Sequence, residues 1–380
     1  MAQARRKKIL LVANSTWNFF NFRMNLIDTL IARGYEVVLL SPEDQYLPLL
    51  LAQINVPHIP LKYLDRKSIN PLKEIGLYRE LKQIYESVNP DLIIQYTIKP
   101  NLYGNWAAKK IGIPSVCIVT GLGYVFLHEN WINTLIRKIY KKSLVKADLV
   151  VFENVEDKDQ FISEGFVDDK NAFAVNGCGI NLEYFKPMED VQQKENKVIF
   201  SFVSRLIYDK GIVEFIEAAK SVKSKYPDVE FWVAGEVDEG NPTSIRYESL
   251  YEWVESGIIK YFGHVRDVRP IIAKSDCVVL PSYREGLSRA LTEAMAMEKP
   301  IITCETSGCN TLVEEGVNGY LVPVKDFNAL ADRIEKFYLL PESVRQTFGQ
   351  NGREKVASDF SDKVVTSQLM QLIDGLALNV

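Results

Sequence analysis

The chain is poor in the residues that bind metals through sulfur or imidazole. Its 380 residues include five cysteines and three histidines. These stand at Cys117, Cys178, Cys277, Cys304, Cys309, His58, His128 and His264. Their spacings match no metal-ligand pattern, and most of the cysteines lie in apolar, strand-like runs. We therefore expect buried free thiols, a reducing cytoplasmic setting and no metal site.

Long apolar runs and a dinucleotide-binding signature are also missing. No run is long enough to span a bilayer. The first residues, MAQARRKKILLVANS, have a basic head, but the apolar stretch is too short for a signal peptide and lacks a cleavage site. We interpret this stretch as the first strand. No Gly-x-Gly-x-x-Gly follows it, which argues against a dinucleotide-dependent oxidoreductase.

Positive charge is concentrated early in the chain. Residues 1–147 hold 20 Lys and Arg against 10 Asp and Glu, whereas the whole chain holds 45 against 49, which leaves 25 against 39 for the remainder. The two parts therefore carry net charges of opposite sign. A basic half of this kind indicates that one part of the protein faces an anionic partner.

Strand-like and helix-like patterns alternate twice along the chain. We expect an N-terminal domain over residues 1–186 and a second alternation over residues 197–360. The polar, aperiodic stretch PMEDVQQKENK is the predicted linker, and residues 361–380 read as an amphipathic helix. Repeated strand-helix alternation predicts the α/β class, with parallel sheets covered on both faces.

Two carboxylates stand eight positions apart in PSYREGLSRALTEAMA, after the apolar run SDCVVL. The order predicts a buried strand, a turn and a helix that opens near Gly286. Glu285 would then lie at the helix start and Glu293 about two turns inside. A helix start holds phosphate on its free amides, and carboxylates accept hydrogen bonds from sugar hydroxyls. The pattern indicates a sugar-nucleotide site, although acidic pairs on helices are more often simply solvated.

A second strand-turn-helix pattern, FSFVSRLIYDKGIVEFIEAAK, carries two cations at its turn. Arg205 offers a planar fork and Lys210 a point charge, a combination that suits a diphosphate. The alternative is a structural ion pair with Asp209 or Glu214.

The two patterns together resemble a known family. SRLxxxKG and EGLSRALTE, about eighty residues apart, resemble the E-x7-E retaining glycosyltransferases of the two-domain GT-B type, family 4, over nearly the whole chain. FFNFRMNLI, YTIKPNLYG, TGLGYVF and AGEVDEGNPTSI look most like bacterial enzymes that build lipid-linked glycans, including N-acetylgalactosaminyltransferases of N-glycan assembly. The resemblance implies two Rossmann-like parallel-sheet domains facing a central cleft, with the C-terminal helix crossing back to the N-terminal domain.

The resemblance also implies roles for individual residues. Glu285, Arg205 and Lys210 would be catalytic, with Glu285 contacting the donor sugar and Glu293 the ribose. The other implied donor-binding residues are Gly286, Leu287, Ser288, Arg289, Gly263, His264, Val265, Ser15 and Thr16. Many relatives have Pro where this chain has Ser288, so the phosphate cradle would have an altered shape.

The implied chemistry retains the anomeric configuration. Negative charge grows on the departing phosphate, where cations and helix-end amides lower the barrier. The leading interpretation is front-face attack with the leaving phosphate as base, and a covalent Glu285 nucleophile is the alternative. No metal or other cofactor is required, and Asp157-Lys158-Asp159, the only Asp-x-Asp, falls in a predicted helix and is taken as surface.

Acceptor contacts are expected from the first half of the chain. The candidates are Asn18, Arg23, Lys99, Asn101, Thr120 and Tyr124. The loop NSTWNFFNFR replaces a Gly-rich turn of many relatives, and its alternative interpretation is a helix cap followed by core aromatics. The family often carries a His near TGLG, and this chain does not, so Thr120 is the substitute candidate.

Residues 131–146, WINTLIRKIYKKSLVK, form a cationic amphipathic helix in projection. Its candidate membrane contacts are Trp131, Arg137, Lys138, Lys141 and Lys142. The pattern is typical of an interfacial helix, and the alternative is a helix packed on its sheet with a hydrated basic face.

We therefore expect a retaining enzyme that moves a hexose or N-acetylhexosamine, foremost N-acetylgalactosamine, from UDP to a saccharide on polyprenyl diphosphate. It would act at the cytoplasmic face of the cell membrane, with no nucleic-acid partner. The alternatives are a transferase with a soluble or capsular acceptor and a non-catalytic nucleotide-binding scaffold.

Overall fold

The computed structural model describes residues 5–66, 68, 70–188 and 197–377. The chain divides into two compact units, Met1–Gly179 with Asp362–Val380, and Ile180–Ser361. Residues 180–186, which the sequence pattern assigned to the N-terminal domain, belong to the second unit. Most of the predicted linker, residues 189–196, lies outside the described residues.

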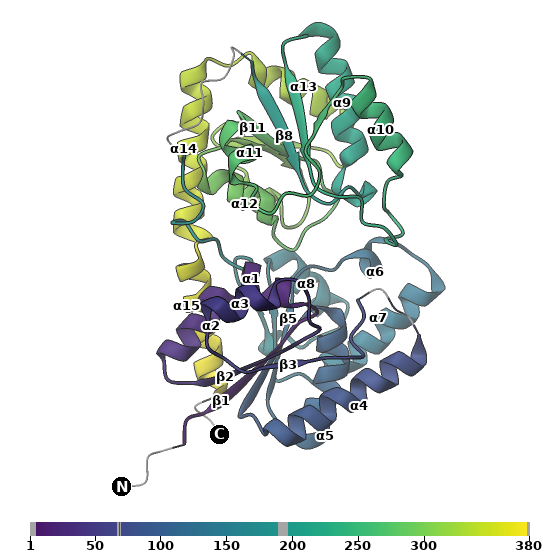
Figure 1. Ribbon diagram of the computed structural model, residues 1–380, viewed down its shortest axis with the longest axis vertical. Coiled ribbons are helices and arrows are strands. Elements are labelled where there is room, and N and C mark those ends of the chain that lie inside the picture. Colours follow the sequence, from purple (N-terminus) through teal and green to yellow (C-terminus); the bar gives the residue numbers. More distant parts are fainter. Residues whose placement is uncertain (1–4, 67, 69, 189–196, 378–380) are drawn as a thin grey trace. The chain divides into compact units, whose positions relative to one another are not determined.

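The first unit is built on a parallel sheet (Figure 1), with the strand order β3-β2-β1-β4-β5-β6-β7 within the described residues. Its strands are β1 (Lys8–Val12), β2 (Glu36–Ser41), β3 (His58–Pro60), β4 (Leu92–Tyr96), β5 (Ser115–Val119), β6 (Leu149–Phe152) and β7 (Ala172–Ala174). Its helices are α1 (Thr16–Phe22), α2 (Met24–Ala32), α3 (Leu47–Gln53), α4 (Pro71–Val88), α5 (Asn105–Ile111), α6 (Tyr124–Leu127), α7 (Trp131–Leu144), α8 (Val155–Ser163) and α15 (Asp362–Ala377). A π-helical turn, η1 (Pro100–Gly104), precedes α5, and a 3₁₀ turn, η2 (Asp169–Asn171), precedes β7.

Strand β1 shows why its sheet is covered on both faces. Successive side chains of a strand point to opposite faces, and all four apolar residues after Lys8 are buried. Ile9 and Leu11 pack in the cluster that includes residues of α2 and α15, whereas Leu10 and Val12 pack in the cluster that includes residues of α4 and α5. The continuous apolar run is therefore explained by two helix layers.

The C-terminal helix α15 completes the first unit. Val365, Leu369 and Ile373 recur at intervals of four residues and are buried in the cluster that includes α2. The side-chain amide of Asn25 donates to the backbone oxygen of Asp362 at 2.9 Å, just where α15 begins. The tail therefore supplies part of the hydrophobic core of the first unit.

The second unit has a parallel sheet with the strand order β10-β9-β8-β11-β12-β13 within the described residues. Its strands are β8 (Ile199–Val203), β9 (Glu230–Ala234), β10 (Lys260–Tyr261), β11 (Cys277–Leu280), β12 (Ile301–Cys304) and β13 (Gly319–Val322). Its helices are α9 (Ile212–Lys225), α10 (Tyr247–Glu255), α11 (Arg269–Lys274), α12 (Arg289–Ala296), α13 (Phe327–Tyr338) and α14 (Glu342–Asp359), with 3₁₀ turns η3 (Tyr208–Lys210) and η4 (Asn310–Leu312). The two parallel sheets confirm the predicted α/β class.

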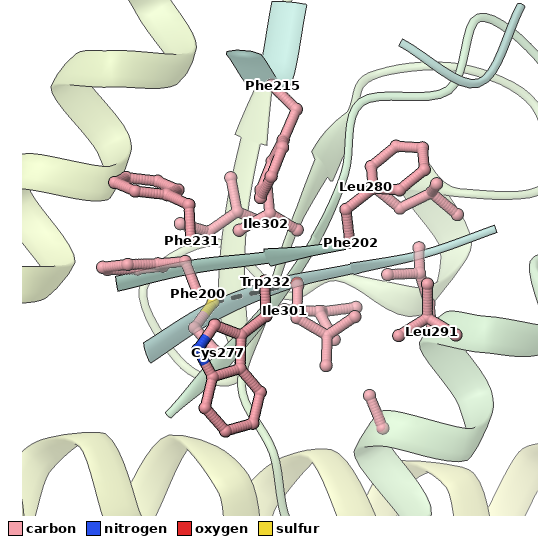
Figure 2. Packing of buried hydrophobic residues seen from close by; sticks show 14 of the residues in the cluster. Phe200, Phe202, Phe215, Phe231, Trp232, Cys277, Leu280, Leu291, Ile301 and Ile302 are labelled. Atoms are coloured by element: carbon pink, nitrogen blue, oxygen red, sulfur yellow. Dashed lines mark hydrogen bonds between the residues drawn. The ribbon is translucent and has the colours of Figure 1, made fainter. Parts of the chain in front are cut away.

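Aromatic side chains fill one face of the second sheet (Figure 2). Phe200 and Phe231, on neighbouring strands, stack with ring centres 5.6 Å apart, and Phe215 of α9 meets Phe231 edge-on at 5.6 Å. Trp232 follows Phe231 along β9 and points to the opposite face. Such pairs contribute about 0.5–1.5 kcal/mol each beyond the area they bury. This core holds the strand ends in fixed positions.

The strand order of the second sheet reverses direction between β8 and β11. The chain first adds β9 and β10 on one side of β8, and then returns to add β11, β12 and β13 on the other. In open parallel sheets, ligands bind beyond the carboxyl ends of the strands at this reversal. The segments that follow β8 and β11 are the two motif-bearing turns of the sequence.

Candidate active site

Backbone hydrogen bonds join the turn after β8 to the turn after β11. The amide of Tyr283 donates to the backbone oxygen of Asp209 at 2.9 Å, and the hydroxyl of Ser282 donates to the same oxygen at 3.2 Å. Gly211 allows this approach, because its φ is +74° and a Cβ there would lie 2.1 Å from the backbone oxygen of Pro281. Two motifs far apart in the sequence thus become one site.

The ammonium group of Lys210 contacts the carboxylate of Glu285 across the two turns. The two side chains are only 17% and 12% exposed. The sequence-based alternative named Asp209 and Glu214 as ion-pair partners of the cations, and these carboxylates instead accept from the hydroxyls of Thr243 and Tyr283. Lys210 and Glu285 therefore form one paired unit.

Arg205 lies in the turn after β8 with its side chain 46% exposed. Its Nη1 lies 2.7 Å from Oδ2 of Asp238, a residue of the segment between β9 and α10. Sequence reasoning did not single out Asp238. The available signal was its position in AGEVDEGNPTSI, a few residues after β9, which pairs with β8, the strand that precedes Arg205.

Helix α12 begins later than the sequence predicted. It starts at Arg289 rather than near Gly286, because the backbone amides of Glu285 and Ser288 donate to the backbone oxygens of Ser307 and Gly308, at 3.1 Å each. Glu285 therefore lies in the preceding turn. Residues 285–288 are held by the loop after β12, and the amide of Ser288 is already used within the protein.

Glu293 lies about one turn inside α12 rather than two. Its Oε1 accepts from Nε of Arg289 at 2.8 Å, and its side chain is 13% exposed. Burial raises the pKa of the Glu293 carboxyl, and the neighbouring Arg289 opposes that shift. Arg289 also has its guanidinium 5.6 Å from the ring centre of Phe185.

Residues Gly263, His264 and Val265 follow β10 at the same edge of the second sheet. The backbone oxygen of Gly263 accepts from the amide of Gly235 at 2.8 Å, and Val265 packs against the core. His264 is half-exposed, and its Nδ1 lies 3.8 Å from a carboxylate oxygen of Glu236. Of the three, His264 therefore presents the most accessible side chain.

In the first unit, an internal carboxylate occupies the start of α1. The side chain of Asp44 accepts from the hydroxyl of Thr16 and, at 2.9 Å, from the amide of Trp17. Ser15 caps the helix by accepting from the amide of Asn18 at 3.2 Å. The hydroxyl of Thr16, a predicted donor-binding residue, therefore already donates to Asp44 within the protein.

Arg23 and Asn101, two predicted acceptor contacts, are inside the first unit. The guanidinium of Arg23 pairs with Glu153 at 3.0 Å, with the two side chains 4% and 7% exposed, and lies 4.3 Å from the ring centre of Tyr96. Asn101 is fully buried and donates to the backbone oxygen of Ile118 at 2.8 Å. The structure does not support acceptor contacts for either residue, because both side chains are withdrawn from solvent.

Of the other candidate acceptor residues, Lys99 is partly exposed and paired. Its ammonium lies 2.5 Å from the carboxylate of Glu74, with the two side chains 18% and 14% exposed. Asn18 is buried, with 6% exposed, so the structure does not support an acceptor contact for this residue either. Thr120 follows β5 and is half-buried. Tyr124 opens α6, with its ring centre 4.5 Å from that of His128.

Helix α7 divides the predicted membrane residues into two groups. Trp131 is 76% exposed, and Lys138 and Lys142 lie on the exposed side with it. Arg137 instead donates to the backbone oxygen of Val125 at 2.8 Å, and Lys141 donates to that of Glu164 at 2.6 Å. The second group is therefore tied to the first unit itself.

Within the described part of the chain, no group of three or more His, Cys, Asp and Glu side chains is arranged to hold a metal ion. Asp157 and Asp159 lie in α8, but Asp157 is buried, so its assignment to the surface was wrong. None of the described helices is both long and apolar enough to cross a bilayer.

Comparison with known proteins shows the family to which a chain with this fold and these paired turns belongs. A family model described as "Glycosyl transferases group 1" matches residues 185–355, and one described as "Glycosyl transferase 4-like" matches residues 8–154. Together they match most of the chain, so the protein belongs to the GT-B glycosyltransferases, as the motifs predicted. The chain is an enzyme of this family.

Several curated relatives match most or all of the chain, and two of them have names that state an acceptor. An N,N'-diacetylbacillosaminyl-diphospho-undecaprenol alpha-1,3-N-acetylgalactosaminyltransferase of Campylobacter jejuni is 26% identical, over 98% of this chain and 100% of the relative. A UDP-Gal:alpha-D-GlcNAc-diphosphoundecaprenol alpha-1,3-galactosyltransferase of Escherichia coli is 26% identical over 82% of each chain. These values support the family and leave the donor sugar open.

Solved structures share the fold. Sucrose-phosphate synthase of Thermosynechococcus elongatus matches with a TM-score of 0.81 and 20% identity, over 99% of this chain and 100% of the other. Anabaena HepE in complex with UDP-glucose matches with a TM-score of 0.79 and 21% identity, over 97% and 99%. The architecture of two Rossmann-like domains is therefore that of GT-B enzymes.

Proposed function

We propose that the protein is a retaining transferase that moves a hexose or N-acetylhexosamine from a UDP-sugar to a saccharide on polyprenyl diphosphate, in assembly of a bacterial glycan, capsule or exopolysaccharide. N-acetylgalactosamine is the leading donor sugar. The observation that carries the proposal is the contact between Lys210 and Glu285, which joins two turns at the strand-order reversal of the second sheet.

The charges at these turns suit a departing diphosphate. When the bond between the sugar and the diphosphate breaks, negative charge grows on the leaving oxygen, and fixed cations stabilise that charge. The Arg205 guanidinium is accessible and forked, and Lys210 supplies a point charge held in place by Glu285. Because these side chains provide the positive charge, we propose transfer without a divalent metal.

Glu285 suits hydrogen bonding to sugar hydroxyls better than covalent attack. Its carboxylate is stabilised by Lys210, which lowers its nucleophilicity. We therefore propose front-face substitution. The acceptor oxygen forms the bond to the anomeric carbon, the bond from that carbon to the diphosphate breaks, and the leaving phosphate takes the proton of the acceptor hydroxyl. Glu293 and Arg289, with His264 near the base, complete the proposed donor site.

The nature of the acceptor is supported by charge and by the relatives. Residues 1–147 carry an excess of ten positive charges, 20 Lys and Arg against 10 Asp and Glu. The matched Campylobacter jejuni and Escherichia coli enzymes are both described as acting on undecaprenol diphosphate-linked substrates. An excess of positive charge attracts such an anionic lipid headgroup. We assign the acceptor to the first unit, with Thr120 and Tyr124 as the more accessible candidate contacts.

We also propose peripheral attachment to the cytoplasmic face of the cell membrane through α7. Trp131 and Leu135 are 76% and 49% exposed, and Lys138 and Lys142 lie on the same exposed side of the helix. Exposed aromatic and aliphatic side chains insert at the headgroup boundary, while lysines attract anionic lipids, by about 1 kcal/mol for each lysine near the surface.

Liposome sedimentation tests the attachment. The protein is expected to bind vesicles with anionic lipid at low salt and to release as salt rises. Lys138→Glu with Lys142→Glu should abolish that binding, whereas Lys73→Glu with Lys82→Glu on α4 is a matched charge reversal in the same unit and should reduce it far less. Equal losses in both double variants would refute a specific role of α7.

A screen of UDP-sugars against short-chain polyprenyl-diphosphate saccharides tests the transfer itself. We expect UDP release that depends on the lipid acceptor, and a product whose new linkage, read by NMR, keeps the donor's anomeric configuration. UDP release that depends only on soluble saccharides would overturn the acceptor assignment. Failure of the folded protein to bind UDP in calorimetry would overturn the donor assignment and favour another nucleotide or a non-catalytic role.

A further inference from the structure

The segment between β9 and α10, residues 235–246, packs along the turn that carries both cations of the site. We name it the β9–α10 loop. The amide of Leu206 donates to the backbone oxygen of Glu236 at 2.9 Å, and the amide of Tyr208 donates to that of Thr243 at 2.7 Å. The hydroxyl of Thr243 also donates to the carboxylate of Asp209 at 3.1 Å. These three hydrogen bonds hold the β9–α10 loop against the turn between β8 and α9.

Asp238 is the charged side chain through which the β9–α10 loop reaches Arg205. It is 9% exposed, its Oδ2 lies 2.7 Å from Nη1 of Arg205, and the same oxygen accepts from Nδ2 of Asn241 at 3.1 Å. Asn241 closes the turn, since its backbone amide donates to the backbone oxygen of Asp238 at 2.9 Å. Hydrogen bonds within the β9–α10 loop thus fix the carboxylate of Asp238, independently of its contact with Arg205.

The contact with Asp238 orients the guanidinium of Arg205 and leaves other N–H groups of it accessible to a ligand. A guanidinium has five N–H donors in a rigid fork, and the contact with Asp238 uses Nη1. The side chain is still 46% exposed, so further donors can reach a ligand. A free arginine side chain samples many rotamers, and a fixed partner removes that freedom before the substrate arrives.

We infer that Asp238 is a positioning residue, which orients the guanidinium of Arg205 toward the departing diphosphate, and that Asn241 in turn orients Asp238. This inference rests on the proposed function. It extends the catalytic machinery to a loop that neither motif includes. It also explains why a buried carboxylate lies beside the proposed anion site, although its negative charge repels the ligand.

The two roles of Asp238 have opposite effects on binding and on turnover. Loss of its negative charge removes repulsion, so the affinity for UDP should stay the same or increase. Loss of its hold on Arg205 misplaces a donor that acts in the transition state, and such misplacement reduces kcat by about 10- to 100-fold. A purely structural role of the loop would instead weaken UDP binding and turnover together.

The experiment compares Asp238→Asn and Asp238→Glu with the wild-type enzyme, using UDP calorimetry and kcat at saturating donor. Asp238→Asn should lose turnover without losing UDP affinity, and Asp238→Glu should recover part of kcat because it restores the carboxylate. Asp228→Asn is the matched control. Asp228 is an exposed residue just before β9, whereas Asp238 follows the other end of that strand. The kcat of the Asp228→Asn variant should equal that of the wild type.

A double mutant separates positioning from other effects. Because Asp238 acts through Arg205, Asp238→Asn should reduce kcat no further in an Arg205→Ala background. A multiplicative loss in the double mutant, or a kcat of Asp238→Asn within about twofold of wild type, would overturn the inference. If Asp238→Asn does not fold, Asp238→Glu and Asp238→Ser carry the same comparison. Absence of UDP binding to the wild type would refute the proposed function as well, whereas normal binding with a multiplicative loss refutes positioning alone.

Discussion

Replacement of Lys210 by methionine is the most direct perturbation of the site. Methionine keeps most of the aliphatic length of lysine but removes its charge. In the wild type, the Lys210 ammonium contacts Glu285, and the two side chains are 17% and 12% exposed. Lys210→Met therefore leaves a largely buried carboxylate without its cation and also removes a positive charge from the proposed diphosphate site.

The expected magnitudes follow from these two losses. Removal of one partner from a fully buried ion pair destabilises a protein by about 3–5 kcal/mol, and the residual exposure here reduces the expected loss to about 2–3 kcal/mol. Loss of one group that stabilises charge in the transition state reduces turnover by about 10²- to 10³-fold. The two effects are independent, because stability depends on Glu285 and turnover on the charge of Lys210.

Urea unfolding, UDP calorimetry and kcat measure these effects separately. Adding Glu285→Gln to Lys210→Met removes the unpaired charge, so the double variant should recover most of the stability and none of the turnover. Lys225→Met is the matched control, because Lys225 is 55% exposed and its pair with Glu335, at 2.7 Å, is largely solvated. That variant should leave both the free energy of unfolding and kcat close to their wild-type values.

Wild-type UDP affinity in Lys210→Met, together with a loss of less than about tenfold in kcat, would refute the role of the Lys210 charge. A double variant that remains as unstable as Lys210→Met would show that the unpaired Glu285 is not the source of the instability.

Three further predictions concern other parts of the molecule. Arg23→Met should destabilise the first unit by about 3–5 kcal/mol in urea, because Glu153 would stay buried and unpaired, and an unchanged midpoint would contradict this role. Burial raises the folded-state pKa of Glu293 above its ordinary value of 4.5, so its stabilising effect is complete at low pH and is lost as pH rises through the folded-state pKa. Glu293→Gln should therefore flatten the fall in unfolding free energy above about pH 4.5, and an unchanged slope would exclude this carboxyl as its source. Transfer should persist in EDTA, and activity that disappears on chelation and returns with Mn²⁺ or Mg²⁺ would contradict a metal-independent mechanism.

Much of the fold was readable from local patterns. The strand and helix alternation follows from apolar runs and from helical periodicity, which depend on near neighbours in the chain. Helix α4 shows such a pattern, because Leu77, Leu81 and Tyr85 recur at intervals of four residues and are buried, and Asn70 caps the helix by accepting from the amide of Leu72. The family also followed from sequence, because Arg205, Lys210, Glu285 and Glu293 occur at recognisable spacings.

The start of α12 and the fate of Arg23 were not readable in this way. The amide of Ser288 donates to Gly308, and Arg23 pairs with Glu153, which is 130 positions away in the chain. Neither partner is marked by any local pattern. No local pattern marks Asp44 either. It follows β2 and accepts from the amide of Trp17 at the start of α1.

Periodicity and motif spacing therefore specified the secondary structure, the class of fold and the residue types of the site. The ionic partners, Glu285 for Lys210 and Asp238 for Arg205, emerged when β8 was placed between β9 and β11. The physical reason is that backbone preference and amphipathic pattern act over a few residues, whereas an ion pair requires two side chains to share a few ångströms of space. The order of the strands in the sheet brings the two side chains to that distance. Such a pair therefore forms only when distant segments of the chain pack together.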